Sequence, residues 1–320
     1  MAFEMGEAGG ATLMECSPGG ADKRRRRAAL LVVLSLLCAA LAGCAARGAQ
    51  TPSVPSARVD RFDEARAWRL IELQLGYGQR PAGSPQLRRL AVVLKTMLPQ
   101  GHFEPLPGQP ELRNIVGTVP GALPAIVVGA HYDTLAAPRG FLGANNGAAG
   151  TAVVVALARE LARAHRARGA PELRFVLFDG EEPSAGTPED DPDFYANSLR
   201  GSQAYVAAHP GQVRAMVLLD YVANKGLRLP REASSDPVLW KQVQGAARTV
   251  GVGEVFPDGT ETEVLDDHTP FLHARVPAVD LIDWSYPGHQ LGDTLDKLSV
   301  RSVDAVGETM MQLLLAMSVT

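Results

Sequence analysis

Cysteine is scarce in this sequence: its 320 residues contain three, at positions 16, 38 and 44. The part that follows Cys44, about 276 residues, holds no thiol, which excludes disulfide bridges and cysteine-ligated metal sites there. A chain of this length needs no such bridge, because it can bury enough apolar surface to fold by itself.

Positive charge is also sparse outside one short segment. The chain carries a formal net charge of −4, and its basic run is residues 23–27. Once that run is removed no basic stripe remains, so we expect no nucleic-acid partner. The remaining composition is ordinary for a globular protein, and a single domain is the expected organisation.

Long hydrophobic runs are absent as well. The apolar stretch of residues 28–40, about 16 residues long when Leu41-Ala42-Gly43 is included, is short of the roughly 20 that a transmembrane helix needs. With the basic run before it and Leu41-Ala42-Gly43-Cys44 after it, this stretch has the layout of a signal peptide. The Leu-Ala-Gly-Cys ending resembles a bacterial lipobox, in which cleavage precedes Cys44 and lipid is attached to its sulfur. A single transmembrane anchor is the alternative.

These N-terminal features predict an exported bacterial lipoprotein, held on the periplasmic or cell-surface side of a membrane by its lipid alone. We expect residues 1–44 to be the signal peptide. Residues 45–59 are small, polar and proline-bearing, which is typical of a flexible tether. Residues 60–320 then form the folded domain.

Hydrophobic periodicity beyond residue 60 alternates between helical and strand-like segments. The predicted helices cover residues 60–75, 84–98, 147–164, 202–208, 237–250 and 300–317. The predicted strands cover residues 112–119, 125–130, 174–178, 216–219 and 278–282. This alternation predicts an α/β fold with a doubly wound, mostly parallel central sheet and helices on both faces.

Imidazole and carboxylate side chains follow four of the predicted strands. These residues are His131, Glu181, Glu182, Asp220 and His289. Open α/β sheets place their sites beyond the carboxyl ends of the strands, so we expect these side chains to converge. Imidazole and carboxylate are the ligands that zinc accepts where thiolate is absent. The sequence therefore predicts a zinc site with one coordination position left for water.

The adjacent residues Glu181 and Glu182 can have two different functions at such a site. One carboxylate binds the metal, while the other stays free as the general base that takes a proton from metal-bound water. Asp133, two residues after His131, can orient the imidazole through a hydrogen bond.

The order of these motifs resembles that of a known enzyme family. His-x-Asp is followed by Gly-Ala-Asn-Asn-Gly, Asp-Gly-Glu-Glu, Leu-Asp and a late His before Asp-Thr-Leu-Asp-Lys. The order is similar to that of the zinc aminopeptidases of the aminopeptidase Y and bacterial leucyl aminopeptidase type, whose fold the glutaminyl-peptide cyclotransferases share. The resemblance runs from Arg80 to the C-terminus. It implies a zinc exopeptidase-like catalytic domain that holds one or two zinc ions.

The resemblance also implies a role for each matching residue. It makes Glu181 the general base and Glu182 a metal ligand. It places the segment Asp266-Asp267 near the amino group of a peptide substrate. The other implied ligands are His131, Asp220, His289 and residue 146.

Residue 146 is the main departure from the family pattern, because the family has Asp where this chain has Asn146. In the two-zinc members that Asp bridges both metals, and in the cyclotransferases it is one of three ligands to a single zinc. Asn offers a neutral amide oxygen and cannot bridge with two anionic oxygens. We expect weaker metal binding, with one zinc in place of two.

Three functions remain open from the sequence. The first is a metallo-aminopeptidase that removes N-terminal residues from peptides, and the second is a single-zinc glutaminyl-peptide cyclotransferase. The third is a peptide-binding lipoprotein that kept the fold and lost catalysis through Asn146. Gly288 stands where animal cyclotransferases place a Trp before the last ligand, which favours the first function. The motif Asp266-Asp267-His268 leans towards the second.

Overall fold

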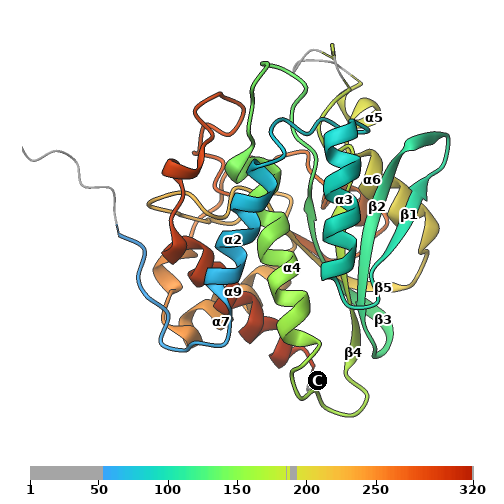
Figure 1. Cartoon of the computed structure of the whole chain (residues 1–320). Coiled ribbons are helices and arrows are strands. Elements are labelled where there is room, and N and C mark those ends of the chain that lie inside the picture. Colours follow the sequence, from blue (N-terminus) through green and yellow to red (C-terminus); the bar gives the residue numbers. More distant parts are fainter. Residues whose placement is uncertain (1–52, 185, 188–192, 319–320) are drawn as a thin grey trace, which may run out of the picture. The chain divides into compact units, whose positions relative to one another are not determined.

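The computed structural model describes residues 53–184, 186–187 and 193–318 (Figure 1). The predicted signal peptide, Cys44 and the first part of the predicted tether lie outside these residues. The end of the predicted tether packs against the domain: Val54 is buried, and the backbone N–H of Arg58 donates to the carbonyl oxygen of Val250 at 2.8 Å. Within the described part of the chain, no helix has the length and apolar character needed to cross a bilayer.

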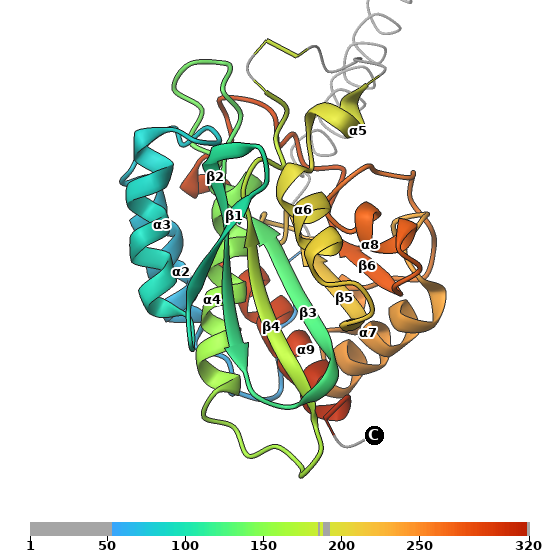
Figure 2. The same cartoon turned by 90° about the vertical axis from the view of Figure 1, so that its right-hand side faces the viewer.

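In the described residues, six strands form one mixed sheet in the order β1-β2-β4-β3-β5-β6 (Figure 2). They are β1 (His102–Leu106), β2 (Gln109–Val119), β3 (Ala122–His131), β4 (Pro171–Phe178), β5 (Val213–Leu219) and β6 (Ala278–Leu281). The strands β4, β3, β5 and β6 are parallel, whereas β2 is antiparallel to both of its neighbours. The predicted mostly parallel sheet is confirmed, and β1 is an additional strand that the sequence analysis did not predict.

The helices lie close to their predicted positions. The longer ones are α2 (Glu64–Leu75), α3 (Pro85–Met97), α4 (Gly150–Leu161), α6 (Arg200–Ala208), α7 (Pro237–Val250) and α9 (Val300–Ala316). Short helices or turns are η1 (Ala144–Ala149), α5 (Phe194–Asn197), η2 (Gly253–Val255), α8 (Thr269–His273) and η3 (Leu295–Lys297). At the start of α3 the Ser84 side chain accepts the N–H of Leu87 at 3.2 Å, and Pro85 follows in the first turn. This is the capped start that the sequence predicts.

Helices cover both faces of the sheet (Figures 1 and 2). Successive residues of a strand point to opposite faces, and the core divides accordingly. In β3, Val128 packs into the core formed with α2, α3, α4, α7 and α9, and Val127 packs into the smaller core formed with α6 and α8. The expected doubly wound arrangement is therefore observed.

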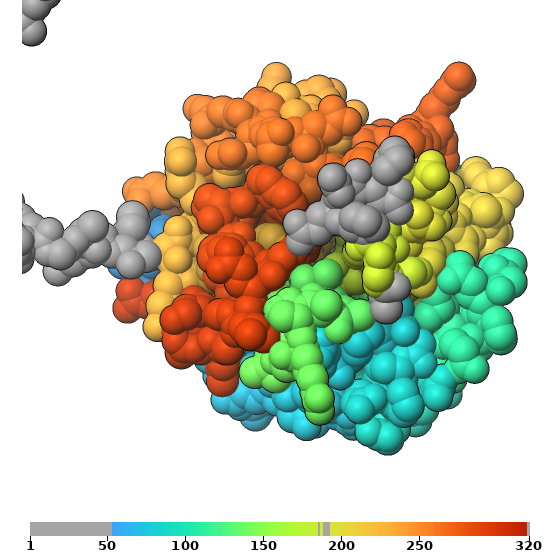
Figure 3. All heavy atoms as spheres, turned by 90° about the horizontal axis from the view of Figure 1, so that it is seen from above, coloured from blue at the N-terminus to red at the C-terminus, as the bar shows by residue number. Residues whose placement is uncertain are grey.

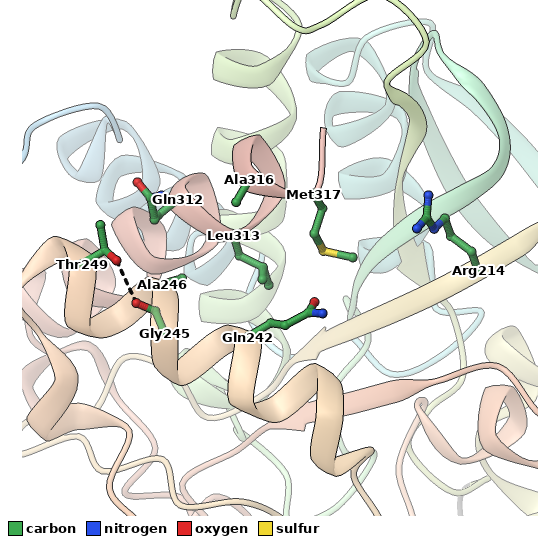
Figure 4. Close-up of a pocket in the computed structure, with 9 residues that line it drawn as sticks. All are labelled: Arg214, Gln242, Gly245, Ala246, Thr249, Gln312, Leu313, Ala316 and Met317. Atoms are coloured by element: carbon green, nitrogen blue, oxygen red, sulfur yellow. Dashed lines mark hydrogen bonds between the residues drawn. The ribbon is translucent and has the colours of Figure 1, made fainter. Parts of the chain in front are cut away.

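The carboxyl ends of the four parallel strands meet at one edge of the sheet, which is the upper end in Figure 1. Seen from above, the segments that follow β3, β4 and β6 lie side by side at this end (Figure 3). A hollow of about 340 Å³ lies at the opposite end, between α7 and α9 and next to Arg214 near the start of β5 (Figure 4). Because sites of open α/β sheets lie beyond the carboxyl ends of the strands, the upper end is the place to examine.

Candidate active site

His131 is the last residue of β3 and is surrounded by carboxylates. Its Nδ1 lies 3.5 Å from Oδ1 of Asp133 and 3.6 Å from Oε2 of Glu181, and its Nε2 lies 3.5 Å from Oδ1 of Asp220. Both ring nitrogens are buried and lack a hydrogen-bond partner within the described residues. Burial lowers the pKa of the imidazole, but the three carboxylates outweigh burial and raise it well above its ordinary value.

Asp133 connects the ends of two neighbouring strands. Its carboxylate is fully buried and accepts the backbone N–H groups of Glu181 and Glu182, each at 3.3 Å. One of these two oxygens is also the one that faces His131. Asp133 therefore lies beside His131 without a hydrogen bond to its ring, and it holds the backbone of the glutamate pair.

The two glutamates after β4 differ in their surroundings. The Glu181 side chain is 14% exposed and lies on the His131 side, whereas Glu182 is buried. Oε1 of Glu182 accepts a hydrogen bond of 2.7 Å from the side-chain amide of Asn146. Burial raises the pKa of Glu182 to about 8 and raises that of Glu181 well above its ordinary value.

Asn146 lies in the turn η1, at the point where the helical backbone is interrupted (φ −79°, ψ 98°). The following residue, Gly147, has φ 92°, and a Cβ added there would meet the Asp133 carbonyl oxygen at 2.5 Å and the His131 ring at 3.2 Å. Glycine is required at this position because it tolerates the left-handed backbone and leaves room for the imidazole. The turn thus brings the Asn146 amide to Glu182 and Gly147 against the His131 ring.

Asp293 fixes this turn to the loop that carries His289, a connection that the sequence analysis did not predict. Its carboxylate accepts the backbone N–H groups of Asn145 and Asn146, each at 2.9 Å. It also accepts the hydroxyl of Tyr286 at 2.6 Å. The motif Asp-Thr-Leu-Asp-Lys, which begins at Asp293, could be recognised in the sequence, but the groups that bind Asp293 could not.

Asp220 follows β5 and precedes an aromatic cluster. Its Oδ1 accepts the N–H of Tyr221 at 2.9 Å. The Tyr221 ring stacks on Trp284, with centroids 6.2 Å apart and planes at 4°, and contacts the rings of Tyr286 and His289 at 5.8 and 6.4 Å. The sequence analysis assigned no role to Tyr221.

The aromatic cluster borders a cavity of about 270 Å³. The lining residues are Tyr221, Trp284, Tyr286, Pro287, Gly288, His289 and Gln290. A side chain at position 288 would overlap the Tyr221 ring. The Tyr221 ring therefore occupies the space beside His289 that a residue larger than glycine at position 288 would need.

Asp266 and Asp267 lie just before α8 and are buried. Oδ1 of Asp267 accepts the Ser202 hydroxyl at 2.5 Å, and Oδ1 of Asp266 accepts the backbone N–H of Asp267 at 2.6 Å. The charges of both carboxylates raise the pKa of Glu181. They thus lie on the side of the site where the predicted base is found.

The structure brings most of the predicted metal-binding residues together. His131, Asp220, Glu182 and Asn146 converge at the strand ends, whereas His289 is exposed at the rim, against the edge of the Tyr221 ring. Over the part of the chain that the structure describes, no three His, Cys, Asp or Glu side chains form a group spaced to hold a metal ion. The position of His289 depends on its loop, which aromatic contacts and Asp293 hold.

Comparison of the sequence with protein-family models identifies its family. The model of Peptidase family M28 matches residues 114–314, which include all the strand ends described above. The chain belongs to peptidase family M28. The resemblance inferred from the motif order and the α/β fold are thereby confirmed.

Proteins similar to this chain include glutaminyl-peptide cyclotransferases. A glutaminyl-peptide cyclotransferase of Bothrops jararaca is 26% identical over 226 residues, covering 60% of this chain and 61% of the relative. The chain thus spans about three fifths of the length of that relative.

Solved structures with the same fold are also similar to this chain. A glutaminyl cyclase of an Acidobacteriales bacterium has a TM-score of 0.68 and 26% identity, covering 84% of this chain and 98% of that one. A leucine aminopeptidase precursor of Bacteroides thetaiotaomicron has a TM-score of 0.69 and 24% identity, covering 81% and 98%. The fold is thus shared with proteins named for either activity.

Proposed function

We propose that this protein is a zinc-dependent enzyme that cyclises the N-terminal glutamine of peptides, with release of ammonia. The observation that carries the proposal is the hydrogen bond of 2.7 Å from the Asn146 amide to Glu182. A neutral amide cannot bridge two zinc ions as a carboxylate does. The site therefore suits one metal, which the family resemblance associates with the cyclotransferases. The relatives at 26% identity named above support this choice over the aminopeptidase that the sequence alone placed first.

The donor set has the chemistry to bind one zinc ion, but His289 lies at the rim and would have to approach Glu182 for the two to share it. Glu182 and His289 would hold it, with the amide oxygen of Asn146 as a weak third donor. In the structure the Asn146 amide nitrogen points to Glu182, so this amide must turn before its oxygen can serve. Bound zinc would polarise the side-chain carbonyl of the substrate glutamine.

Proton transfer falls to Glu181 in this proposal. The nitrogen of the substrate's N-terminal amine forms a bond to the side-chain carbonyl carbon, and the bond from that carbon to the amide nitrogen breaks. Glu181 takes a proton from the amine and gives it to the departing ammonia. Its partial exposure and its position beside His131 suit this exchange.

Substrate recognition in this proposal combines an aromatic wall and a carboxylate. Tyr221, Trp284 and Tyr286 offer flat apolar surfaces beside the site, and the cavity next to them has room for a glutamine side chain. Asp266 meets the substrate's amino group. Animal cyclotransferases have a Trp where this chain has Gly288, and its absence was the main sequence argument against a cyclotransferase. In this proposal the Tyr221 ring, which occupies the space beside Gly288, takes the place of that Trp.

An aminopeptidase is the second candidate, and one contact favours it. Nε2 of His131 and Oδ1 of Asp220 lie 3.5 Å apart, and the resemblance makes both residues ligands in two-zinc members. Glu181 would then take its proton from water and pass it to the leaving amine.

A pair of assays with metal analysis separates the candidates. Ammonia release from a glutaminyl peptide, with one zinc per chain, supports the cyclotransferase. Release of arylamine from a leucyl arylamide supports the aminopeptidase. Peptide binding without either reaction supports the catalytically impaired lipoprotein and overturns the proposal.

A further inference from the structure

The loop between α4 and β4, residues 162–169, lies at the end of the sheet opposite the candidate active site, which is the lower end in Figures 1 and 2. We call this segment the basic loop. Its sequence, Ala-Arg-Ala-His-Arg-Ala-Arg-Gly, contains three arginines and no acidic residue, although the whole chain carries a net charge of −4. Alanines separate the arginines, so the segment is not a continuous basic run like residues 23–27. Positive charge is nevertheless concentrated at this end of the sheet.

Arg166 fixes the basic loop to the neighbouring elements. Its three guanidinium nitrogens donate to three different acceptors: the carbonyl oxygen of Pro120 at 3.2 Å, the carbonyl oxygen of Pro171, and the Ser318 hydroxyl at 3.3 Å. These bonds join the loop to the turn between β2 and β3, to the start of β4 and to the residues after α9. The loop is therefore a defined surface, and Arg166 is the arginine that holds it.

The other two arginines of the basic loop present their charges to solvent. The Arg163 side chain is 60% exposed, and its ionic partner is Glu160 at 3.7 Å. Arg168 is exposed and has no ion pair within the described residues. An arginine near the carboxyl end of a helix also complements the helix dipole, but Arg168 lies well beyond Leu161, where α4 ends. Because an exposed ion pair contributes little, both guanidinium groups can bind an external anion.

An exposed apolar side chain lies next to the basic loop. Leu123, near the start of β3, is 57% exposed. Its neighbour Ala122 donates its backbone N–H to the carbonyl oxygen of Ala170 at 2.9 Å, so the start of β3 lies beside the end of the loop. Arginines beside an exposed leucine suit a surface that is anionic outside and apolar beneath, as a phospholipid bilayer is. A nucleic acid would match the charge of the arginines but not the leucine.

Strand β4 separates the basic loop from the active site. The loop precedes Pro171 at one end of the strand, and Glu181 follows Phe178 at the other. The 8 residues of the strand, at about 3.3 Å each, place the two ends about 26 Å apart. A bilayer in contact with the loop would therefore lie about three Debye lengths from the catalytic carboxylates at physiological salt. The active site would then face away from the membrane, where soluble peptides can reach it.

We propose that the basic loop, together with Leu123, is a membrane-contacting surface that binds anionic phospholipid headgroups and turns the active site away from the bilayer. The proposal does not depend on the reaction that the protein catalyses. Contact through two arginines and one leucine is weak, so it orients a chain that the predicted lipid on Cys44 already holds at the membrane. Because the chain as a whole is negatively charged, an anionic bilayer disfavours other orientations.

The test measures binding of the folded part to vesicles. Residues 52–320 form one compact unit that buries its own core, so they can be studied without the N-terminal segment, which would itself bind lipid. The partition coefficient is measured by sedimentation with vesicles of phosphatidylcholine, with and without about one third phosphatidylglycerol. The variant is Arg163→Gln with Arg168→Gln. The matched control is Arg139→Gln with Arg301→Gln, which removes two exposed arginines from the loop after β3 and the first turn of α9.

At low salt we expect the wild type to prefer the anionic vesicles and the loop variant to lose about tenfold or more in partition coefficient, because each arginine near such a surface contributes about fivefold. The control pair should stay within about threefold of the wild type, and added salt should weaken binding. Leu123→Gln should lower binding without changing its salt dependence, because it removes apolar area alone. All variants should melt like the wild type, since Arg166 still holds the loop.

Three results overturn the proposal. The first is a wild type that does not bind anionic vesicles at low salt, or binds pure phosphatidylcholine equally well. The second is a loss in the control pair as large as that in the loop variant. The third is binding to a DNA duplex that depends on the loop arginines while the vesicles are not bound, which would assign the basic loop to nucleic acid.

Discussion

Asn146 changes the charge of the site more than any other single residue. In a two-zinc arrangement Glu182 and Asp220 would be the anionic ligands, and the site would offer two formal negative charges against the four positive charges of the zinc ions. The Asn146 amide adds none and makes a hydrogen bond to Glu182. We therefore expect the site to bind a second metal poorly and to bind zinc less tightly than a site with a carboxylate at position 146.

The variant Asn146→Asp tests this interpretation directly. The donor of the 2.7 Å hydrogen bond becomes an acceptor, so two buried carboxylates face each other and require a cation or a proton between them. We expect more zinc per chain after dialysis and a melting temperature that falls when a chelator is added. Two tightly bound zinc ions in the wild type would show that Asn146 does not limit metal binding.

The roles proposed for Glu181 and Glu182 differ, and a matched pair of variants distinguishes them. Glu181→Gln keeps the backbone N–H that donates to Asp133 and removes the group that carries the proton. We expect at least about a hundredfold loss of turnover with unchanged zinc content, the usual contribution of a general base. Glu182→Gln should instead lose zinc. The opposite pattern of zinc loss would mean that the two roles are exchanged.

A site residue can be predicted from the sequence when the residues next to it form a recognisable pattern. His131, Glu181 and Asp220 each follow an apolar run, so their place at a strand end could be predicted. Tyr221 carries no such signal, because its importance comes from contacts with segments far away in the sequence.

On the scale of secondary-structure elements, the Asp293 carboxylate joins the loop after β6 to the turn η1 by hydrogen bonds. Asp293→Ala leaves two buried backbone N–H groups and the Tyr286 hydroxyl without an acceptor. We expect a loss of about 3 kcal/mol in urea unfolding together with weaker zinc binding, because both Asn146 and His289 lose their common support. Tyr286→Phe removes one bond and should cost about 1 kcal/mol. Unchanged zinc affinity in Asp293→Ala would limit Asp293 to a role in stability.

The contact between α9 and the segment before α2 depends on pH through Asp304. Burial, then the charges of Glu64 and Glu308, raise its pKa from 3.8 to about 6. Because the folded state favours the protonated form, stability is highest below the ordinary pKa and is lost as the pH rises through about 6.

Asp304→Asn removes this penalty and keeps an acceptor for the backbone of Ala57. We expect a gain of about 1 kcal/mol at pH 7, discounted because the side chain is half-exposed. This corresponds to about 2–4 °C in melting temperature, with little change at pH 4. An equal gain at both pH values would assign the effect to packing and not to charge.

Helices and strands whose apolar residues recur regularly could be predicted. Those whose position depends on packing against other elements could not. The helix predicted over residues 237–250 has the bounds of α7 (Pro237–Val250), because Asp236 and Pro237 mark its start and apolar residues recur along one face. Strand β1 (His102–Leu106) lacks such a period and contains a proline, and it forms as an edge strand paired with β2. Helix α8 is one short turn, and its position follows from packing beneath β6 and beside α6.

For the whole molecule, the sequence predicts an anchor that lies outside the described residues, and Cys44 is the residue that tests it. If lipid on its sulfur attaches the protein to a membrane, Cys44→Ser should move it from the membrane fraction to the soluble fraction of the cell. The domain itself should be unaffected, because no cysteine follows position 44. Immunoblots of fractionated cells, with a melting curve of each protein, measure both effects.

Cys38→Ser is the matched control for this prediction. It also replaces a thiol of the N-terminal segment, but it lies within the apolar run that precedes the Leu-Ala-Gly-Cys sequence. A serine there leaves the cleavage motif and the acceptor sulfur in place, so the variant should remain in the membrane fraction. Release of both variants would show that the apolar run, and not the lipid, is what the membrane retains. If Cys44→Ser stays in the membrane fraction, the lipid-anchor prediction is wrong and the single transmembrane anchor takes its place.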